Sequence, residues 1–188
     1  CSGSGGAWSH IVKEMHTLHP TLTVHLSDHY PNLEAFEQLT THSNGSIQFN
    51  PTSVDARSTA FPEGSIVTLL LALHHFMPED VRKILSNATE QHTPIVIFEI
   101  QQRTLFDMLI MLVHIPLCWL VMPFMQPSWT QLFFTYVLPI IPLCIVWDGI
   151  VSALRTYTPT ELHDLAKDID QSNEFKWTSG KSPHPIHN

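Results

Sequence analysis

Apolar residues in the first part of the chain follow alternating helical and strand patterns. They recur at three- and four-residue spacing over residues 8–18, which predicts a helix that Pro20 ends. Residues 21–26 alternate between polar and apolar side chains, which predicts a strand. A short helix starting at a proline over 31–40 and a second strand over 46–50 complete this part.

The same alternation continues further along the chain. An almost continuous apolar run over 65–73 predicts a strand covered on both faces, and 94–100 predicts another. Between them, residues 78–89 carry one helical apolar stripe, formed by Val81, Ile84, Leu85 and Ala88. A last helix is predicted over 158–169, where Thr158 and Glu161 have capping-box spacing. Alternating strands and helices favour an α/β sandwich with a mostly parallel sheet.

The ends of the sequence do not complete this pattern. A glycine-rich turn in such a fold follows a central strand, yet the chain opens directly on the glycine-rich "CSGSGG". The far end also stops where one more strand is expected. We therefore expect the first and last strands of the sheet to be missing from this sequence.

Residues 104–147 form an apolar insertion whose only formally charged side chain is Asp107. We expect a cofactor-binding core over 1–103, the insertion over 104–147, and the rest of the core over 148–188. The insertion is a helical lid over a dry pocket, a plain buried core, or a membrane hairpin. Its first run approaches the roughly 20 residues that span a bilayer. Arg103 and Arg155 at its outer ends suit a hairpin with both ends in the cytoplasm.

Composition narrows the function further. The net charge is −8, so a nucleic-acid backbone would be repelled over most of the surface, and we exclude nucleic acid as a partner. Three widely spaced cysteines predict neither a disulfide framework nor a zinc site and favour a reducing compartment. The chain shows no signal-peptide pattern. The expected location is the cytoplasm or the cytoplasmic face of a membrane.

Polar features follow several predicted strands. Gly3, Gly5 and Gly6 permit positive φ in front of a helix, where an anionic or strongly polar ligand group can bind. Asp28 comes about 20 residues later, where an acid can bind both hydroxyls of a ribose. Asp55, after the next strand, could accept a hydrogen bond from an exocyclic amine. Such features converge where open α/β sheets bind ligands.

Four motifs, "CSGSGGAW", "LSDHYPN", "SVDARS" and "LALHHFMPEDVRKIL", together resemble those of class I S-adenosylmethionine-dependent methyltransferases, over residues 1 to about 101 and more loosely after Gly149. The resemblance implies a Rossmann-like three-layer sandwich and S-adenosyl-L-methionine as cofactor. It implies the following contacts: Ser2, Gly3, Ser4 and Gly5 with the methionine part, Asp28 with the ribose, His29 beside the adenine, Asp55 and Ala56 with the adenine amine, and Leu71 and Ala72 along the cofactor floor.

Two other functions compete with methyl transfer. A nicotinamide dehydrogenase uses a similar turn, but its fingerprint needs a third glycine where this chain has the bulky Trp8. A membrane-associated module could keep the cofactor fold without turnover. The apolar insertion favours an apolar or amphiphilic small molecule, such as a lipid, as methyl acceptor.

Several side chains are candidates for the chemistry. His74 and His75 follow the fourth expected strand, and one of them could act as a base. Asp148 is a further catalytic candidate. It shares a helical face with Arg155, so this pair would either orient the acceptor or fasten the insertion to the core. Tyr157 and Glu99 are weaker candidates for the acceptor pocket, and no metal site is predicted.

Overall fold

The computed structural model describes residues 2–170 and 174–182, so Cys1 and parts of the expected 148–188 segment lie outside the described residues. The chain divides into two compact units, and each is described by itself. Unit 1 comprises Cys1–Ala72, Phe76–Phe98 and Leu165–Lys176. Unit 2 comprises Leu73–His75, Glu99–Asp164 and Trp177–Asn188.

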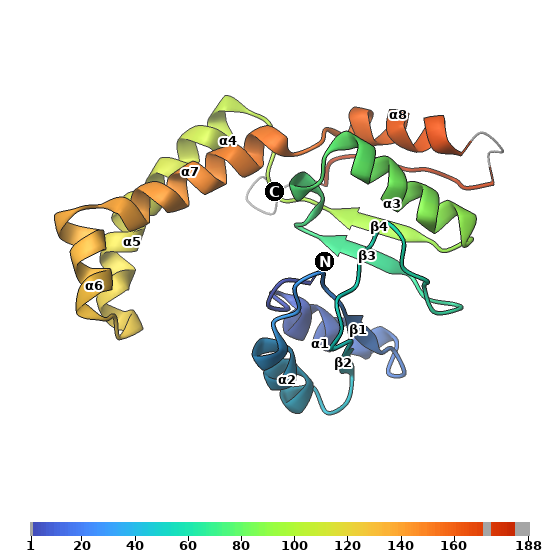
Figure 1. Cartoon of the computed structure of the whole chain (residues 1–188), viewed down its shortest axis with the longest axis horizontal. Coiled ribbons are helices and arrows are strands. Elements are labelled where there is room, and N and C mark those ends of the chain that lie inside the picture. Colours follow the sequence, from blue (N-terminus) through green and yellow to red (C-terminus); the bar gives the residue numbers. More distant parts are fainter. Residues whose placement is uncertain (1, 171–173, 183–188) are drawn as a thin grey trace. The chain divides into compact units, whose positions relative to one another are not determined.

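Unit 1 begins with helix α1 (Trp8–Leu18) and a β-α-β segment (Figure 1). Strands β1 (Val24–Leu26) and β2 (Ile47–Phe49) pair in parallel, and helix α2 (Leu33–His42) connects them. The predicted helices and strands are present here. Helix α2 begins two residues after the expected proline, because the Asn32 side chain caps it by accepting the Ala35 N–H at 3.2 Å.

A second β-α-β segment follows in the same unit. Strands β3 (Val67–Leu70) and β4 (Ile95–Phe98) are parallel, and helix α3 (Pro78–Glu90) lies along one side of them (Figure 1). The four residues of the predicted α3 stripe are all buried, which confirms that stripe. The expectation that both faces of this sheet are covered is wrong, because Phe98 is 55% exposed and Val96 is also exposed.

The strands described above form short sheets. Among the described residues, β1 pairs with β2 and β3 pairs with β4, and each pair is a separate two-stranded parallel sheet. The observed class is mixed α/β with short parallel sheets and several helices.

The core of the first segment contains Val12, Leu26, Phe36 and Ile47, all at most 3% exposed. These side chains come from α1, β1, α2 and β2, so each element contributes one apolar face. Burying such large side chains stabilises the fold by roughly 1.5–3 kcal/mol each. The end of β1, and the turn that follows it, are thereby held against α1 and α2.

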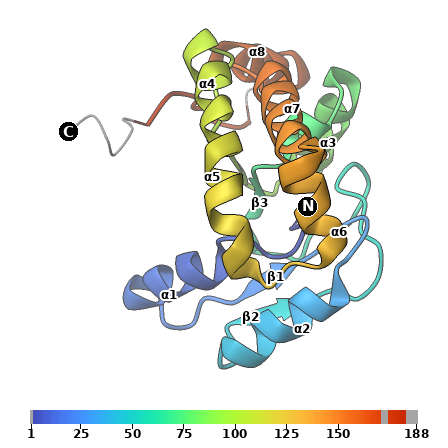
Figure 2. The same ribbon diagram turned by 90° about the vertical axis from the view of Figure 1, so that its left-hand side faces the viewer.

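Unit 2 contains a hairpin of helices. Its first arm runs through α4 (Leu105–Ile110), η2 (Met111–Val113), α5 (His114–Val121) and η3 (Met122–Met125). The second arm runs through α6 (Trp129–Leu132), the π-helical turn η4 (Phe133–Val137) and α7 (Ile140–Arg155). Figure 2 shows α4 and α5 beside α7.

The two arms pack closely at Gly149. A Cβ atom at this position would lie 2.7 Å from the Met111 sulfur, so a larger residue would require the Met111 side chain to move. The expected boundary between residues 147 and 148 falls inside α7, which is one continuous helix.

The ends of the hairpin are tied together within unit 2. Arg103 donates to the Thr156 carbonyl at 2.9 Å and pairs with Glu161 at 3.1 Å. The predicted capping box of helix α8 (Pro159–Ile169) is present: Glu161 N–H donates to the Thr158 hydroxyl and Thr158 N–H to the Glu161 carboxylate.

Candidate functional site

The glycine turn that precedes α1 is the first candidate site, and it lies in unit 1. Gly3 and Gly5 have φ values of +52° and +83°, in the left-handed region that favours glycine. The Gly5 N–H donates to the Ser2 carbonyl at 2.7 Å and closes the turn. A Cβ at Gly5 would also collide with a Leu39 methyl group, so a larger residue fits here only if the Leu39 side chain moves.

The turn is fastened to the residues that follow β1. The Gly3 N–H donates to the Asp28 carboxylate at 2.9 Å, and the Ser27 N–H donates to the Ser2 hydroxyl at 3.2 Å. Ser4 accepts a longer hydrogen bond from Asn32 at 3.4 Å. Two of the predicted cofactor elements, the turn and Asp28, therefore lie side by side.

Asp28 is held in its ionised form. Burial opposes its charge, but the Tyr30 and Gly3 N–H groups outweigh burial and keep the pKa of Asp28 below its usual value. Each carboxylate oxygen accepts one of these N–H groups, and an ionised carboxylate offers about four acceptor positions. Asp28 can therefore accept further hydrogen bonds from a bound hydroxyl pair.

The loop after β2 lies against the residues that follow β1. The Val54 N–H donates to the Asp28 carbonyl at 2.9 Å, and the Ser53 hydroxyl donates to the His29 carbonyl at 2.7 Å. The Ser53 hydroxyl also lies 3.3 Å from a His29 ring nitrogen. Hydrogen bonds to the Asp28 and His29 carbonyls thus bring these two residues and the Asp55 segment together.

The carboxylate of Asp55 is already occupied by Arg57. The guanidinium donates to both of its oxygens, at 2.7 to 3.1 Å, and the Arg57 N–H adds a fourth contact at 3.0 Å. The Arg57 hydrogen bonds lower the pKa of Asp55 to about 2. Sequence reasoning missed Arg57, although its spacing two residues after Asp55 could have suggested the pair. An adenine amine would reach this carboxylate only after Arg57 releases an oxygen.

The remaining predicted cofactor residues of unit 1 lie in two places. The Ala56 carbonyl accepts the Asn87 amide at 3.2 Å, which ties the Asp55 loop to α3. Leu71, at the end of β3, is 40% exposed and has a φ of +52°, which is uncommon for a branched side chain. Ala72 beside it is buried.

A second cluster lies in unit 2, around the 3-10 turn η1 (Leu73–His75). The Glu99 carboxylate accepts the Leu73 N–H at 2.7 Å and lies 2.8 Å from Nδ1 of His74. Both side chains are less than a tenth exposed. In this contact Nδ1 donates to the carboxylate, which fixes the orientation of the imidazole ring. His74, predicted as a base, and Glu99, predicted for the acceptor pocket, thus form one hydrogen-bonded pair.

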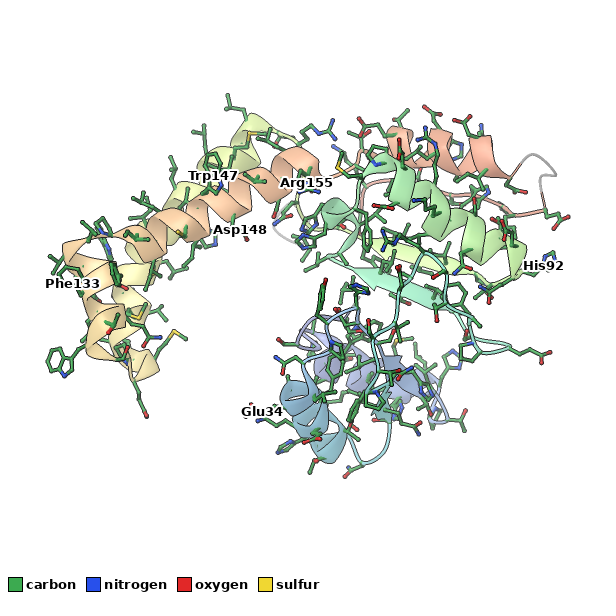
Figure 3. All side chains as sticks on the ribbon, viewed as in Figure 1. Glu34, His92, Phe133, Trp147, Asp148 and Arg155 are labelled. Carbon is green, nitrogen blue, oxygen red and sulfur yellow. The ribbon has the colours of Figure 1, made fainter. Side chains whose placement is uncertain are left out.

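His75, Asp148 and Arg155 belong to the same cluster. Arg155 donates to the His75 carbonyl at 3.0 Å, and Asp148 lies two turns earlier on α7 (Figure 3). Burial, helped by the charges of His74 and Arg155, lowers the pKa of His75 from 6.5 and outweighs Glu99 and Asp148, which raise it. His75 is therefore neutral at neutral pH and can accept a proton. Tyr157 lies just after α7 and is half-buried.

Surface hollows lie in both units of the described residues. One, in unit 1, is lined by Val12, His16, Leu39 and Ile47 among others, and none of the predicted cofactor residues lines it. The other follows α7 from Ile140 to Ile150 and includes Asp148. Within residues 2–170 and 174–182, no group of three or more His, Cys, Asp or Glu side chains could hold a metal ion.

Comparison of the chain with protein-family models, with curated proteins and with solved structures gives no match.

Proposed function

We propose that this chain is an S-adenosylmethionine-dependent methyltransferase acting on an apolar or amphiphilic small molecule. The observation that carries the proposal is the hydrogen bond from the Gly3 N–H to the Asp28 carboxylate. This bond joins the glycine turn, whose glycines have positive φ, to the ionised Asp28. Asp28 can still accept further hydrogen bonds, and both features lie in unit 1.

The donor set of unit 1 fits such a cofactor. A Cβ atom added at Gly3 would meet nothing within 4 Å, so the turn has open space at this position. Ser2, Ser4 and the turn would hold the amino-acid end, and Asp28 would accept the ribose hydroxyls. When bound, the cofactor would supply an activated methyl group on a sulfonium.

The finer fold that we propose is a Rossmann-like three-layer sandwich. Both strand pairs are parallel and each is joined by a helix, as in doubly wound sheets. In the usual strand order, 3-2-1-4-5, the first strand lies in the centre of the sheet. If β1 and β2 take the second and third positions, and β3 and β4 the fourth and fifth, a sheet without that central strand leaves the two separate pairs observed here.

The chemistry we assign to unit 2 is proton transfer and acceptor orientation. In-line methyl transfer needs a base only when the nucleophile arrives protonated. His74, oriented by Glu99, or the neutral His75 would take that proton. Asp148 and Arg155, at the end of a long uncharged stretch, would orient a polar head group beside apolar side chains.

Thermal unfolding of the full chain with S-adenosylhomocysteine tests the cofactor. A ligand at about a hundredfold its Kd adds about 2.7 kcal/mol, which raises the Tm by roughly 5–10 °C in a chain of this size. The Asp28→Asn variant should bind about tenfold to a hundredfold more weakly, because hydrogen bonds to a charged group are lost. Asp168→Asn, an exposed change on α8 in unit 1, should leave binding unchanged.

Three results would each overturn all or part of the proposal. Stabilisation by NAD instead of S-adenosylhomocysteine would support the nicotinamide enzyme. Binding of S-adenosylhomocysteine without methyl transfer to any extracted lipid or amphiphile would support a binding module. Methylation of small, highly polar metabolites alone would refute the assigned acceptor class.

A further inference from the structure

Residues 105–147, called the apolar hairpin below, carry large side chains that are not packed inside the protein. Leu105–Met125 is 21 residues long, and it contains an 18-residue stretch with a mean hydropathy of 2.1 in which no residue is fully buried. At about 1.5 Å per residue it is about 32 Å long, close to the roughly 30 Å of a bilayer's hydrocarbon core. Among the described residues it is the one unbroken helix that is long and apolar enough to cross a membrane.

The exposed side chains occur on both arms and from one end of the hairpin to the other. The largest exposed fractions belong to Leu105, Phe106, Leu120, Phe124, Met125, Trp129, Val137 and Trp147. Figure 3 shows the side chains along both arms, with Phe133 and Trp147 labelled. A surface helix of a water-soluble domain carries its apolar residues in one stripe, and a helix that is apolar all round requires an apolar environment all round.

Polar groups of the hairpin are bonded within it. The Trp119 indole N–H donates to the Thr135 carbonyl at 2.9 Å, and the Tyr136 hydroxyl donates to the Trp119 carbonyl. The buried Thr135 hydroxyl donates to the Gln131 carbonyl at 2.7 Å, and Ser128 and Gln131 form a capping box at the turn. Polar groups inside a bilayer must form their hydrogen bonds within the protein, because lipid chains offer no hydrogen-bonding partner.

Charged side chains lie only at or near the two ends of the hairpin, away from its turn. Residues 108–147 contain no Asp, Glu, Lys or Arg, and charged residues begin again at Asp148. Arg103 reaches across from the first arm to the Thr156 carbonyl just beyond the second arm, so the two ends are held together. Arg103 and Arg155 place positive charge at both ends, the pattern of a hairpin that enters a membrane from the cytoplasmic side.

We propose that the apolar hairpin inserts into a lipid bilayer with its turn leading and both ends on the same face. The second arm enters as a bent segment, because Trp129–Val137 and Ile140–Arg155 meet at 72° around Pro139. A protein lid would cover one side of the hairpin and leave its other apolar sides in water, whereas lipid covers them all. This proposal holds whether or not the chain transfers methyl groups.

Vesicle flotation tests the insertion. The full chain is mixed in detergent with vesicles of equal parts phosphatidylcholine and phosphatidylglycerol, and the detergent is removed. The protein should float with the vesicles and stay bound in high salt and alkaline carbonate. Leu120→Arg should lower the partition ratio about a hundredfold, because a charge within an inserted helix is unfavourable. Leu18→Arg changes an equally exposed leucine on α1, 77% against 69% exposed, and should not alter it.

Cysteine labelling locates the lipid-covered surface. In a variant with Cys1 and Cys118 replaced by serine, Cys144, which is exposed on α7, should react with a water-soluble maleimide in dilute detergent and be protected in vesicles. A cysteine introduced by Glu34→Cys on α2 should react equally in both. Equal flotation of Leu120→Arg and wild type, or equal reactivity of Cys144 in detergent and in vesicles, would overturn the proposal. Binding of S-adenosylhomocysteine is independent of either result.

Discussion

The two units place their apolar side chains in opposite environments. In unit 1, Phe36 and Leu26 are at most 1% exposed, whereas in unit 2 Phe124 and Trp129 are 82% and 88% exposed. Unit 1 arranges apolar residues on single faces of short helices and strands, so that they meet in a core. The apolar hairpin has too few facing elements to cover its own surface. Hydropathy alone therefore does not show whether a side chain is buried. The spatial pattern of the apolar positions shows it.

Matched truncations of two phenylalanines give the largest contrast. Phe36→Ala removes a fully buried side chain from the unit 1 core and should destabilise the chain by about 3–5 kcal/mol. Phe124→Ala removes an 82% exposed side chain and should change the free energy of unfolding by about 0.5 kcal/mol or less. Denaturant midpoints in mild detergent measure both. Equal destabilisation would contradict the difference between the units.

Unit 2 nevertheless contains a buried pair of titratable side chains, His74 and Glu99. Glu99→Gln keeps the shape of the side chain but removes the charge that accepts three hydrogen-bond donors, and it should destabilise the chain by about 1.5–3 kcal/mol. Glu161→Gln, in an exposed pair, is the control and should cost less than about 1 kcal/mol. A smaller effect at Glu99 than at Glu161 would argue against the buried pair.

Close packing at the glycine turn should contribute less to stability than the His74–Glu99 pair does. Gly5 and Gly45 have nearly the same φ, +83° and +85°, but only at Gly5 would a Cβ meet another atom. Gly5→Ala should therefore be about 1–3 kcal/mol more destabilising than Gly45→Ala, because the strain at positive φ is common to both and the clash with Leu39 is not. Equal losses in thermal unfolding would show that Leu39 moves aside.

The smallest expected effect on stability comes from the ionisation of Asp55. Its pKa of about 2 lies below the ordinary 3.8, so the ionised form is favoured in the folded chain. The resulting stabilisation is complete above pH 3.8 and is lost as the pH falls towards 2. Arg57→Gln should raise the pKa of Asp55 towards 3.8, as followed by side-chain carboxyl NMR. Glu161, whose pKa is lowered chiefly by the Thr158 N–H, should titrate as before.

Local features of the sequence predicted most of the secondary structure. The α3 stripe and the capping box of α8 depend on residues within a few positions of each other, and both are present. The partners of the candidate residues could not be predicted in this way. Glu99 and His74 are separated by 25 positions, and their contact depends on how strand ends and turns meet.

The sequence by itself determined the alternation of strands and helices, the position of the glycine turn and the uncharged stretch between Asp107 and Asp148, because each is a property of neighbouring residues. Only the tertiary structure decided that Gly3 bonds Asp28, that Arg57 occupies Asp55, and that the hairpin's apolar side chains stay exposed. Hydrogen bonds of fixed geometry and the burial of side chains are set by residues distant in sequence, and periodicity carries no information about which of those residues meet.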